Sequence, residues 1–128
     1  MPGSLYRHLG VWREGDVTVV RFGDHHILDE MTVGKLGDEL YGIATRPDCA
    51  KLLISFVGVE HLTSLMLGRL LMLKRRMEAK PGRFMLCEME PVVYEIFTTT
   101  HLHEILEIHE SLGEALAAMA KEVDHAQS

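Results

Sequence analysis

The sequence predicts an α/β domain in which strands and helices alternate after an N-terminal β-hairpin. Two segments rich in β-branched and aromatic residues, 11–13 and 17–22, flank the turn-forming residues 14–16, which is typical of a hairpin. Residues 51–57 are almost continuously apolar, as expected for a central strand that is covered on both faces. Helical periodicity on both sides of that run predicts a four- to five-stranded mixed sheet with parallel central strands and about four helices.

A first helix and the central strand follow the hairpin. Residues 24–26 are expected to form a loop or a short extension. Four apolar residues then lie near helical spacing: Met31, Leu36, Leu40 and Ile43. They predict a helix of about four turns from residue 29, which ends at residues 46–48 because proline there cannot continue it. The strand at 51–57 comes next, and residues 58–61 form the loop that leaves it.

A second helix is predicted from Thr63 or Ser64 to Met77. Either residue can be the N-cap, since a hydroxyl there accepts a hydrogen bond from an unpaired backbone N–H. One face of this helix is apolar and is expected to lie against the sheet: Met66, Leu70, Leu73 and Met77. The opposite face carries Leu65, Arg69, Met72 and Arg76. Two apolar side chains therefore point outward near the start of this helix.

The last third of the chain predicts one more strand and helix, an edge strand and a closing helix. Residues 83–87 form the strand, and a helix over 91–97 begins with a proline, whose missing N–H costs nothing in the first turn. Residues 106–109 are expected to form the edge strand. A helix over 111–123 begins with an S-x-x-E capping box in which Ser111 is the cap.

Length and composition fit one domain over residues 1–128, with 47% hydrophobic and 25% charged residues. We expect its core at about residues 11–118, with 1–8 and 124–128 as flexible ends. The longest apolar stretch is interrupted and shorter than the ~20 residues that span a bilayer, and the N-terminus has no signal-peptide core. With only two cysteines, the sequence favours a cytoplasmic protein without a membrane partner.

The charge is acidic overall but unevenly distributed. A net charge of −6 argues against nucleic acid as a partner, because phosphate binding needs a basic face. Residues 69–83 nevertheless carry six basic residues and one acid, whereas residues 84–128 carry nine acids and one base. Two interpretations stay open: solvated surfaces of opposite sign, or a basic and an acidic lobe that steer a protein partner.

Patterns of known catalytic chemistry are not found. The sequence has no glycine-rich phosphate loop and no G-x-S-x-G elbow. Cys87 lies in a predicted strand, where a buried and inert thiol is expected. His101 and His103, with Glu104 and His109 nearby, are able to bind a metal, but a site needs three or four convergent ligands, and we expect solvated or capping histidines. We therefore predict a non-enzymatic domain with no catalytic residue, cofactor or metal site.

Thr63 and Ser64 are the most informative residues of the chain. They lie at the start of a helix, on the loop that leaves a central parallel strand, where α/β domains place functional loops. A plain N-cap explains a hydroxyl here without any function. A phosphate at this position would instead add about two negative charges beside the outward Leu65 and Met72, at a helix end that tolerates anions.

The segment 51–68, KLLISFVGVEHLTSLMLG, resembles the strand, loop and helix start of the STAS domain in anti-sigma factor antagonists. That motif is usually written D-L-S-G-V-x-x-[LMI]-D-S-S-G-L-G. The matching residues are Gly58, Val59, Leu62, Ser64, Leu67 and Gly68. Residues 81–86, 91–97 and 102–116 resemble the later elements of the family. Thr63 replaces the usual Asp before the acceptor, and a divergent subgroup with L-[ST]-S-x-x-L-G at this place is more similar.

The resemblance implies a STAS-like fold and a regulatory function. In the family, the serine aligned with Ser64 is phosphorylated by an anti-sigma factor that has serine-kinase activity, and a phosphatase resets the switch. Ser64 is then the expected phosphoacceptor, with Thr63 as the alternative. The expected partner-binding residues are Glu60, His61, Thr63, Ser64, Leu65, Arg69 and Met72. We expect a monomer or a weak homodimer; the alternatives are a phosphorylation-independent scaffold and a small-molecule or nucleotide sensor.

Overall fold

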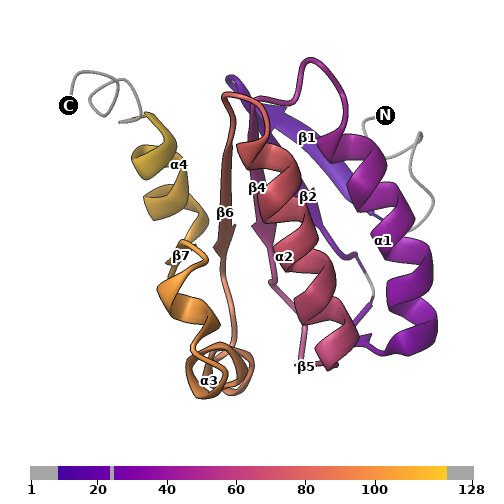
Figure 1. Ribbon diagram of the computed structural model, residues 1–128. Coiled ribbons are helices and arrows are strands. Elements are labelled where there is room, and N and C mark those ends of the chain that lie inside the picture. Colours follow the sequence, from indigo (N-terminus) through magenta and orange to yellow (C-terminus); the bar gives the residue numbers. More distant parts are fainter. Residues whose placement is uncertain (1–8, 24, 121–128) are drawn as a thin grey trace.

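Figure 1 shows the computed structural model, which describes residues 9–23 and 25–120. A five-stranded sheet has the strand order β1-β2-β4-β6-β7. Its strands are β1 (Gly10–Glu14), β2 (Val17–Arg21), β4 (Lys51–Ser55), β6 (Arg83–Cys87) and β7 (Ile108–His109). The helices are α1 (Glu30–Ala44), α2 (Ser64–Glu78), α3 (Pro91–Thr99) and α4 (Leu112–Ala120), with a 3-10 turn η2 at Leu102–Glu104. The expected flexible ends, 1–8 and 124–128, lie outside the described residues.

The N-terminal hairpin and the parallel centre of the sheet are both confirmed. β1 and β2 pair antiparallel around Gly15, whose φ of +63° lies in the left-handed region that suits glycine. β2, β4, β6 and β7 run parallel, so that Leu53 of the central β4 lies opposite Val19 on one side and Met85 on the other. The side chains of β4 after Lys51 are all buried, which explains the apolar run in the sequence.

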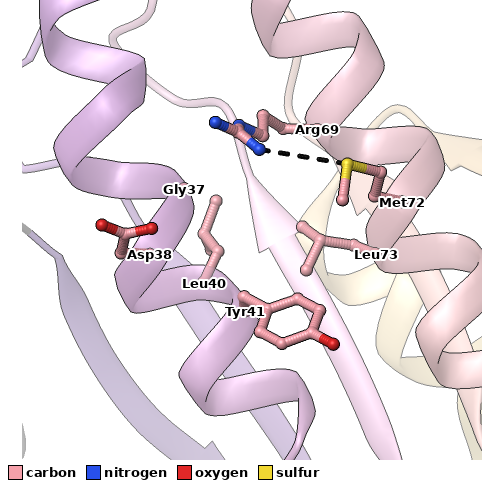
Figure 2. Close-up of a pocket in the computed structure, with 7 residues that line it drawn as sticks. All are labelled: Gly37, Asp38, Leu40, Tyr41, Arg69, Met72 and Leu73. Atoms are coloured by element: carbon pink, nitrogen blue, oxygen red, sulfur yellow. Dashed lines mark hydrogen bonds between the residues drawn. The ribbon is translucent and has the colours of Figure 1, made fainter.

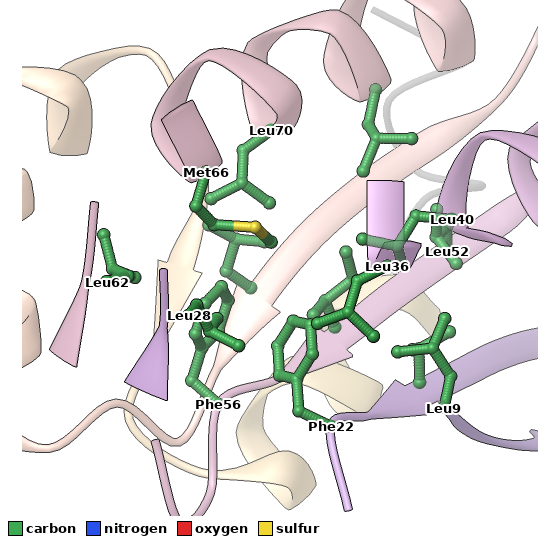
Figure 3. Packing of buried hydrophobic residues seen from close by; sticks show 14 of the residues in the cluster. Leu9, Phe22, Leu28, Leu36, Leu40, Leu52, Phe56, Leu62, Met66 and Leu70 are labelled. Carbon is green, nitrogen blue, oxygen red and sulfur yellow. The ribbon is translucent and has the colours of Figure 1, made fainter. Parts of the chain in front are cut away.

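Helices α1 and α2 lie side by side on one face of the sheet (Figure 1), and α4 packs on the other face. Figure 3 shows the larger core under α1 and α2, where the rings of Phe22 and Phe56 have centroids 5.2 Å apart. The smaller core on the α4 face consists of Val17, Val19, Leu53, Met85, Cys87, Ala115 and Met119. This arrangement agrees with the predicted α/β fold of one mixed sheet and four helices.

A second, two-stranded sheet was not expected from the sequence. Directly after the loop predicted at residues 24–26 lies β3 (Ile27–Leu28), which pairs in parallel with β5 (His61–Leu62). Strands of two residues are too short to show a hydrophobic period. The pair is important for the rest of the molecule because it holds the start of α1 and the start of α2 at the same end of the domain (Figure 1).

Several element boundaries also differ from the sequence-based expectations. β4 ends at Ser55 rather than at residue 57, because Val57 is 42% exposed and leaves the sheet. β7 is limited to Ile108 and His109. Met31 is 79% exposed, since it lies in the first turn of α1, before the buried stripe of that helix begins at Val33.

The helix caps explain two further boundaries. Asp29 is the N-cap of α1, and its Oδ1 accepts a hydrogen bond from the N–H of Thr32 at 2.9 Å. Ser111 fills the same role before α4, where its Oγ accepts from the N–H of Glu114 at 3.0 Å. The predicted Ser111 cap of the closing helix is therefore confirmed, whereas no hydrogen bond joins the Glu114 carboxylate to the Ser111 N–H in the described residues, and the part of the prediction beyond residue 120 lies outside them.

Candidate functional site

The segment between β4 and α2 is held against the segment that follows β2. Nδ1 of His26 donates to the carbonyl oxygen of Gly58 at 2.8 Å, and the N–H groups of Glu60 and His61 donate to the carbonyl oxygen of His26 at 2.7 and 3.3 Å. Gly58 has a φ of +84°, a conformation that strains any residue with a side chain. These contacts fix the loop at the carboxyl edge of the sheet, where α/β domains carry functional loops.

Thr63 and Ser64 differ in what their hydroxyl groups do. Thr63 is the N-cap of α2 and is partly buried; its N–H and its Oγ1 both donate to the carbonyl oxygen of Leu28, at 3.1 and 3.3 Å. The Thr63 hydroxyl therefore makes no capping hydrogen bond to the helix. Ser64 is the first residue of α2 and is exposed, and its hydroxyl has no hydrogen-bond partner among the residues that the structure describes. The accessible hydroxyl at this helix start is thus that of Ser64.

The other residues expected on this surface fall into two groups. Glu60, His61, Leu65 and Met72 are exposed, with exposed fractions of 39% for Leu65 and 50% for Met72. Arg69 is partly buried, and its Nε atom is buried without a hydrogen-bond partner in the described part of the chain. Leu65, Arg69 and Met72 are spaced by four and three residues, so they share one side of α2.

Exposed apolar side chains extend this surface beyond the residues that the sequence indicates. Ile27, Val57 and Val92 are 53%, 42% and 57% exposed. A hollow of about 320 Å³ separates the loop after β4 from the start of α3, and it is lined by His26, Gly58, Glu60, Glu90 and Val92. Sequence reasoning missed Glu90 and Val92. The available signal was that β6 pairs in parallel with β4, which brings the helix starts after both strands to one edge.

The other residues considered for chemistry lie apart from this edge or are buried. Cys87 is fully buried, and burial raises the pKa of its thiol to about 12, as expected for an inert cysteine. His101 has a left-handed backbone before η2 and stacks on His103, with ring centroids 6.3 Å apart. His109 contacts Glu107 at 3.0 Å. Within residues 9–23 and 25–120, no three acidic, histidine or cysteine side chains gather as a metal site.

The basic residues of 69–83 do not form one uniform patch. Lys74 forms an ion pair within α2, and Lys80 donates to carbonyl oxygens at the C-terminal end of α1 at 2.6 and 3.1 Å. Arg83 donates to a carbonyl oxygen of α4 at 2.9 Å. Arg75 and Arg76 are exposed on α2. Part of this positive charge therefore supports the fold, and the part that faces solvent belongs to the arginines of α2.

These features define a small α/β domain. Its candidate functional group is the exposed hydroxyl of Ser64 at the start of α2, beside exposed apolar side chains such as Leu65. A family model for the STAS domain matches residues 11–115, and the chain belongs to this family. A search of curated protein sequences finds no significant match. No helix among the described residues is both long and apolar enough to cross a membrane.

Solved structures of similar fold include several anti-sigma factor antagonists. A STAS domain protein of this kind from Planctomyces limnophilus is 29% identical, with a TM-score of 0.82 over 88% of this chain and 97% of that chain. An anti-sigma factor antagonist from Mycobacterium paratuberculosis is 22% identical, with a TM-score of 0.76 over 86% and 91%. The Bacillus cell fate determinant SpoIIAA in its phosphorylated form is 18% identical, with a TM-score of 0.65 over 87% and 98%.

Proposed function

We propose that this protein is a non-enzymatic regulatory module of the anti-sigma factor antagonist type, which is switched by phosphorylation of Ser64. The observation that carries the proposal is the exposed hydroxyl of Ser64 at the first position of α2 in a STAS domain, which no described residue engages in a hydrogen bond. Two structural neighbours support it, because SpoIIAA is described in both a phosphorylated and an unphosphorylated form. Its partner is an anti-sigma factor with serine-kinase activity in the cytoplasm, and a phosphatase restores the unmodified state.

The local electrostatics suit a reversible phosphate. The first turn of a helix has backbone N–H groups without intrahelical partners, and the helix dipole favours an anion there. A phosphate on Ser64 would therefore be tolerated by the folded domain. It would also add about two negative charges beside the exposed Leu65, the next residue of the helix. A partner that packs an apolar surface against Leu65 would then have to desolvate that charge, and the complex would dissociate.

Ser64 is a better acceptor than Thr63 for a structural reason. A kinase needs a hydroxyl that can reach its active site, and the Thr63 hydroxyl is partly buried and bonded to the Leu28 carbonyl oxygen. Phosphorylation of Thr63 would require breaking one of the two hydrogen bonds by which Thr63 holds β3 to the start of α2. Ser64 has no such contact among the described residues.

The partner-binding surface follows the loop after β4 and the outward side of α2. It consists of Glu60, His61, Thr63, Ser64, Leu65, Arg69 and Met72. Exposed apolar groups supply contact area, and the polar residues around them give the rim that protein interfaces usually have. This surface is the site of action in the proposal, consistent with a family of antagonists that is generally non-enzymatic.

The direct test uses the purified protein, ATP and an anti-sigma factor with serine-kinase activity from the same genome. We expect phosphate on Ser64 by peptide mass spectrometry, and none on the Ser64→Ala variant. Binding of the kinase, measured by calorimetry, is expected for the unmodified protein and for Ser64→Ala, and is expected to be lost in Ser64→Asp.

Ser111→Ala is the matched control, because Ser111 is also a serine at a helix start but caps α4 rather than α2. It should leave both phosphate incorporation and kinase binding unchanged. The proposed switch is wrong if neither Ser64 nor Thr63 takes up phosphate and Ser64→Asp binds the kinase as well as the unmodified protein does. Equal recovery of partners by Ser64→Ala and Ser64→Asp would instead indicate a phosphorylation-independent scaffold.

A further inference from the structure

A groove between α1 and α2 lies farther along the same helix than Ser64. It encloses about 250 Å³ and is lined in part by Gly37, Leu40, Tyr41, Arg69, Met72 and Leu73. Figure 2 shows these side chains around one hollow, with Tyr41 from α1 facing Leu73 from α2. Tyr41 and Met72 are 47% and 50% exposed, so the apolar walls of the groove are open to solvent.

Arg69 is the cationic residue that lines this groove, and the residues that the structure describes do not satisfy all of its N–H donors. Within residues 9–23 and 25–120, the buried Nε has no hydrogen-bond partner, and Nη1 contacts the sulfur of Met72 at 3.9 Å. No carboxylate in the described part of the chain forms an ion pair with Arg69. A buried donor without an acceptor is rare in folded proteins and requires an explanation. A carboxylate from outside the domain would be a suitable acceptor for this guanidinium.

A second cation, Arg76, lies beside the groove against its wall residue Tyr41, and it is not itself one of the lining residues. Arg76 lies over the ring of Tyr41, with 5.8 Å between the guanidinium carbon and the ring centroid, and it has no ion-pair partner among the described residues. Arg69 and Arg76 are seven residues apart on α2, which corresponds to about 10.5 Å along the helix axis. The apolar walls of the groove are formed by Met72, which lies between Arg69 and Arg76 on α2, and by Tyr41 of the facing α1.

Asp38 is the acidic residue that lines this groove. Its carboxylate forms no ion pair with the guanidinium of Arg69. Asp38 therefore reduces the positive potential of the groove without neutralising either arginine. Arg69 in the groove and Arg76 beside it nevertheless outnumber this one acidic residue, in a chain whose net charge is −6.

We propose that this groove binds an acidic amphipathic helix of a partner protein, with two carboxylates about two turns apart on Arg69 and Arg76 and an apolar side chain between Tyr41 and Met72. Charge complementarity selects an acidic occupant, and the two-turn spacing of the cations selects a helical segment over a small carboxylate. The inference rests on the proposed function in that the groove continues the Ser64 surface along α2. Beyond the proposed function, the inference specifies the chemistry of the partner segment that docks in the groove, which phosphorylation of Ser64 does not determine.

The test uses a synthetic helical peptide with Glu at positions i and i+7 and Leu at i+3 and i+4, and a matched peptide with Gln in place of both Glu residues. Binding to the full chain is measured by fluorescence anisotropy at low salt. We expect the Glu peptide to bind at least about tenfold more tightly than the Gln peptide, because charge-assisted bidentate hydrogen bonds would be lost. Arg69→Met and Arg76→Met should each lower the affinity for the Glu peptide by about tenfold.

Arg75→Met is the matched control, since it removes the same charge from an exposed position of α2 that, unlike Arg76, has no cation–π contact with the groove residue Tyr41 among the described residues. It should change the affinity by less than about twofold, and Asp38→Asn should strengthen binding by a similar factor. Because Arg76 is exposed, its variant keeps the test valid even if Arg69→Met fails to fold.

The inference is overturned if the Glu peptide shows no saturable binding up to about 1 mM, or if Arg75→Met weakens it as much as Arg76→Met does. Displacement of the peptide by equimolar glutarate would also overturn it, in favour of a small dicarboxylate. These outcomes are independent of phosphate incorporation at Ser64. An inert Ser64 with a peptide-binding groove would refute the proposed switch alone, and a phosphorylated Ser64 with an inert groove would refute this inference alone.

Discussion

The side chain of Arg69 lies against the backbone of Gly37 so closely that a Cβ atom at position 37 would stand 3.1 Å from Nε and 3.3 Å from Cδ. Glycine in the middle of a helix costs up to about 1 kcal/mol relative to alanine. Gly37 is nevertheless buried within α1, where it leaves room for the arginine stem to cross from α2. The position of Arg69 in the groove therefore depends on the absence of a side chain on the neighbouring helix.

This relationship predicts different effects for two glycines of the same helix. Gly34 is exposed and has no neighbouring atom within 4 Å of a built Cβ, so Gly34→Ala should raise the free energy of unfolding by about 0.5–1 kcal/mol. Gly37→Ala should stabilise the protein less than Gly34→Ala does, because the Arg69 side chain must move by a few tenths of an ångström to make room for the new Cβ. Urea unfolding of both variants measures the difference. Equal stabilisation would show that Arg69 moves freely and is not positioned by Gly37.

The N-cap of α1 predicts a pH-dependent contribution to stability. The hydrogen bond from the Thr32 N–H lowers the pKa of Asp29 from its ordinary value of 3.8. Because the folded-state pKa is the lower one, the stabilisation is present above pH 3.8 and is lost as the pH falls through the folded-state pKa. Asp29→Ala should therefore be less stable than the unmodified protein at pH 7, and this difference should shrink in acid.

Asp29→Asn is the control for that titration. Asparagine caps a helix about as well as aspartate but does not ionise. This variant should stay close to the unmodified protein at pH 7 and should lack its loss of cap stability in acid. Urea unfolding at a series of pH values compares the three proteins. If the free energy of unfolding of Asp29→Ala is lower than that of the unmodified protein by the same amount at pH 7 and in acid, the ionised carboxylate does not have this role.

A polar cluster across the ends of three parallel strands predicts a cost for removing a buried hydroxyl. Ser55 is fully buried; its Oγ donates to Oε1 of Glu88 at 2.5 Å, and Nη2 of Arg21 donates to the same oxygen at 3.0 Å. Ser55→Ala should lower the free energy of unfolding by about 1–2 kcal/mol, because the half-buried Glu88 carboxylate loses a donor. Lys74→Ala, which removes an exposed ion pair on α2, should cost less than about 0.5 kcal/mol. Chemical unfolding that ranks these two variants in the opposite order would show that the cluster contributes little.

The buried cysteines predict slow thiol chemistry. Burial raises the pKa of Cys87 to about 12 and also raises that of Cys49 above its ordinary value of 9.0. Few thiolates are then present at pH 8, and neither side chain is accessible to a reagent. Iodoacetamide should modify neither cysteine in the folded protein and both in urea, as intact-mass spectrometry would show. Rapid modification of Cys87 under native conditions would mean that the edge of the sheet near β7 opens.

The fold was predictable because its main elements carry a clear hydrophobic period. The apolar run of β4, the helical stripe of α2 and the turn at Gly15 each indicate their structure locally. The β3–β5 pair was not predictable, because two residues cannot show a period and their pairing depends on contacts such as that of His26 with Gly58. Local patterns thus predict elements, whereas the short connections between them arise from tertiary packing.

The candidate site was predictable only in part for the same reason. Spacing along α2 places Leu65, Arg69 and Met72 on one side, and the structure agrees. The proximity of Val92 to this surface depends on how α3 packs, and the burial of the Arg69 Nε depends on a glycine of another helix. Neither the position of Val92 nor the burial of the Arg69 Nε can be predicted from the residues next to Ser64 and Arg69 in the sequence.

The different environments of Thr63 and Ser64 predict that their substitutions separate stability from phosphorylation. Thr63→Val keeps the shape of the side chain and the backbone hydrogen bond to Leu28 but removes the one from Oγ1, so it should cost about 1 kcal/mol or less. It should still take up phosphate at Ser64. Ser64→Ala changes an exposed residue without a hydrogen-bond partner in the described chain, so it should unfold within about 0.5 kcal/mol of the unmodified protein and take up no phosphate. Urea unfolding and peptide mass spectrometry give both readouts on the same samples. Phosphate that disappears in Thr63→Val and persists in Ser64→Ala would reverse the assignment, and the hydroxyl that holds β3 against α2 would then be the one that the kinase modifies.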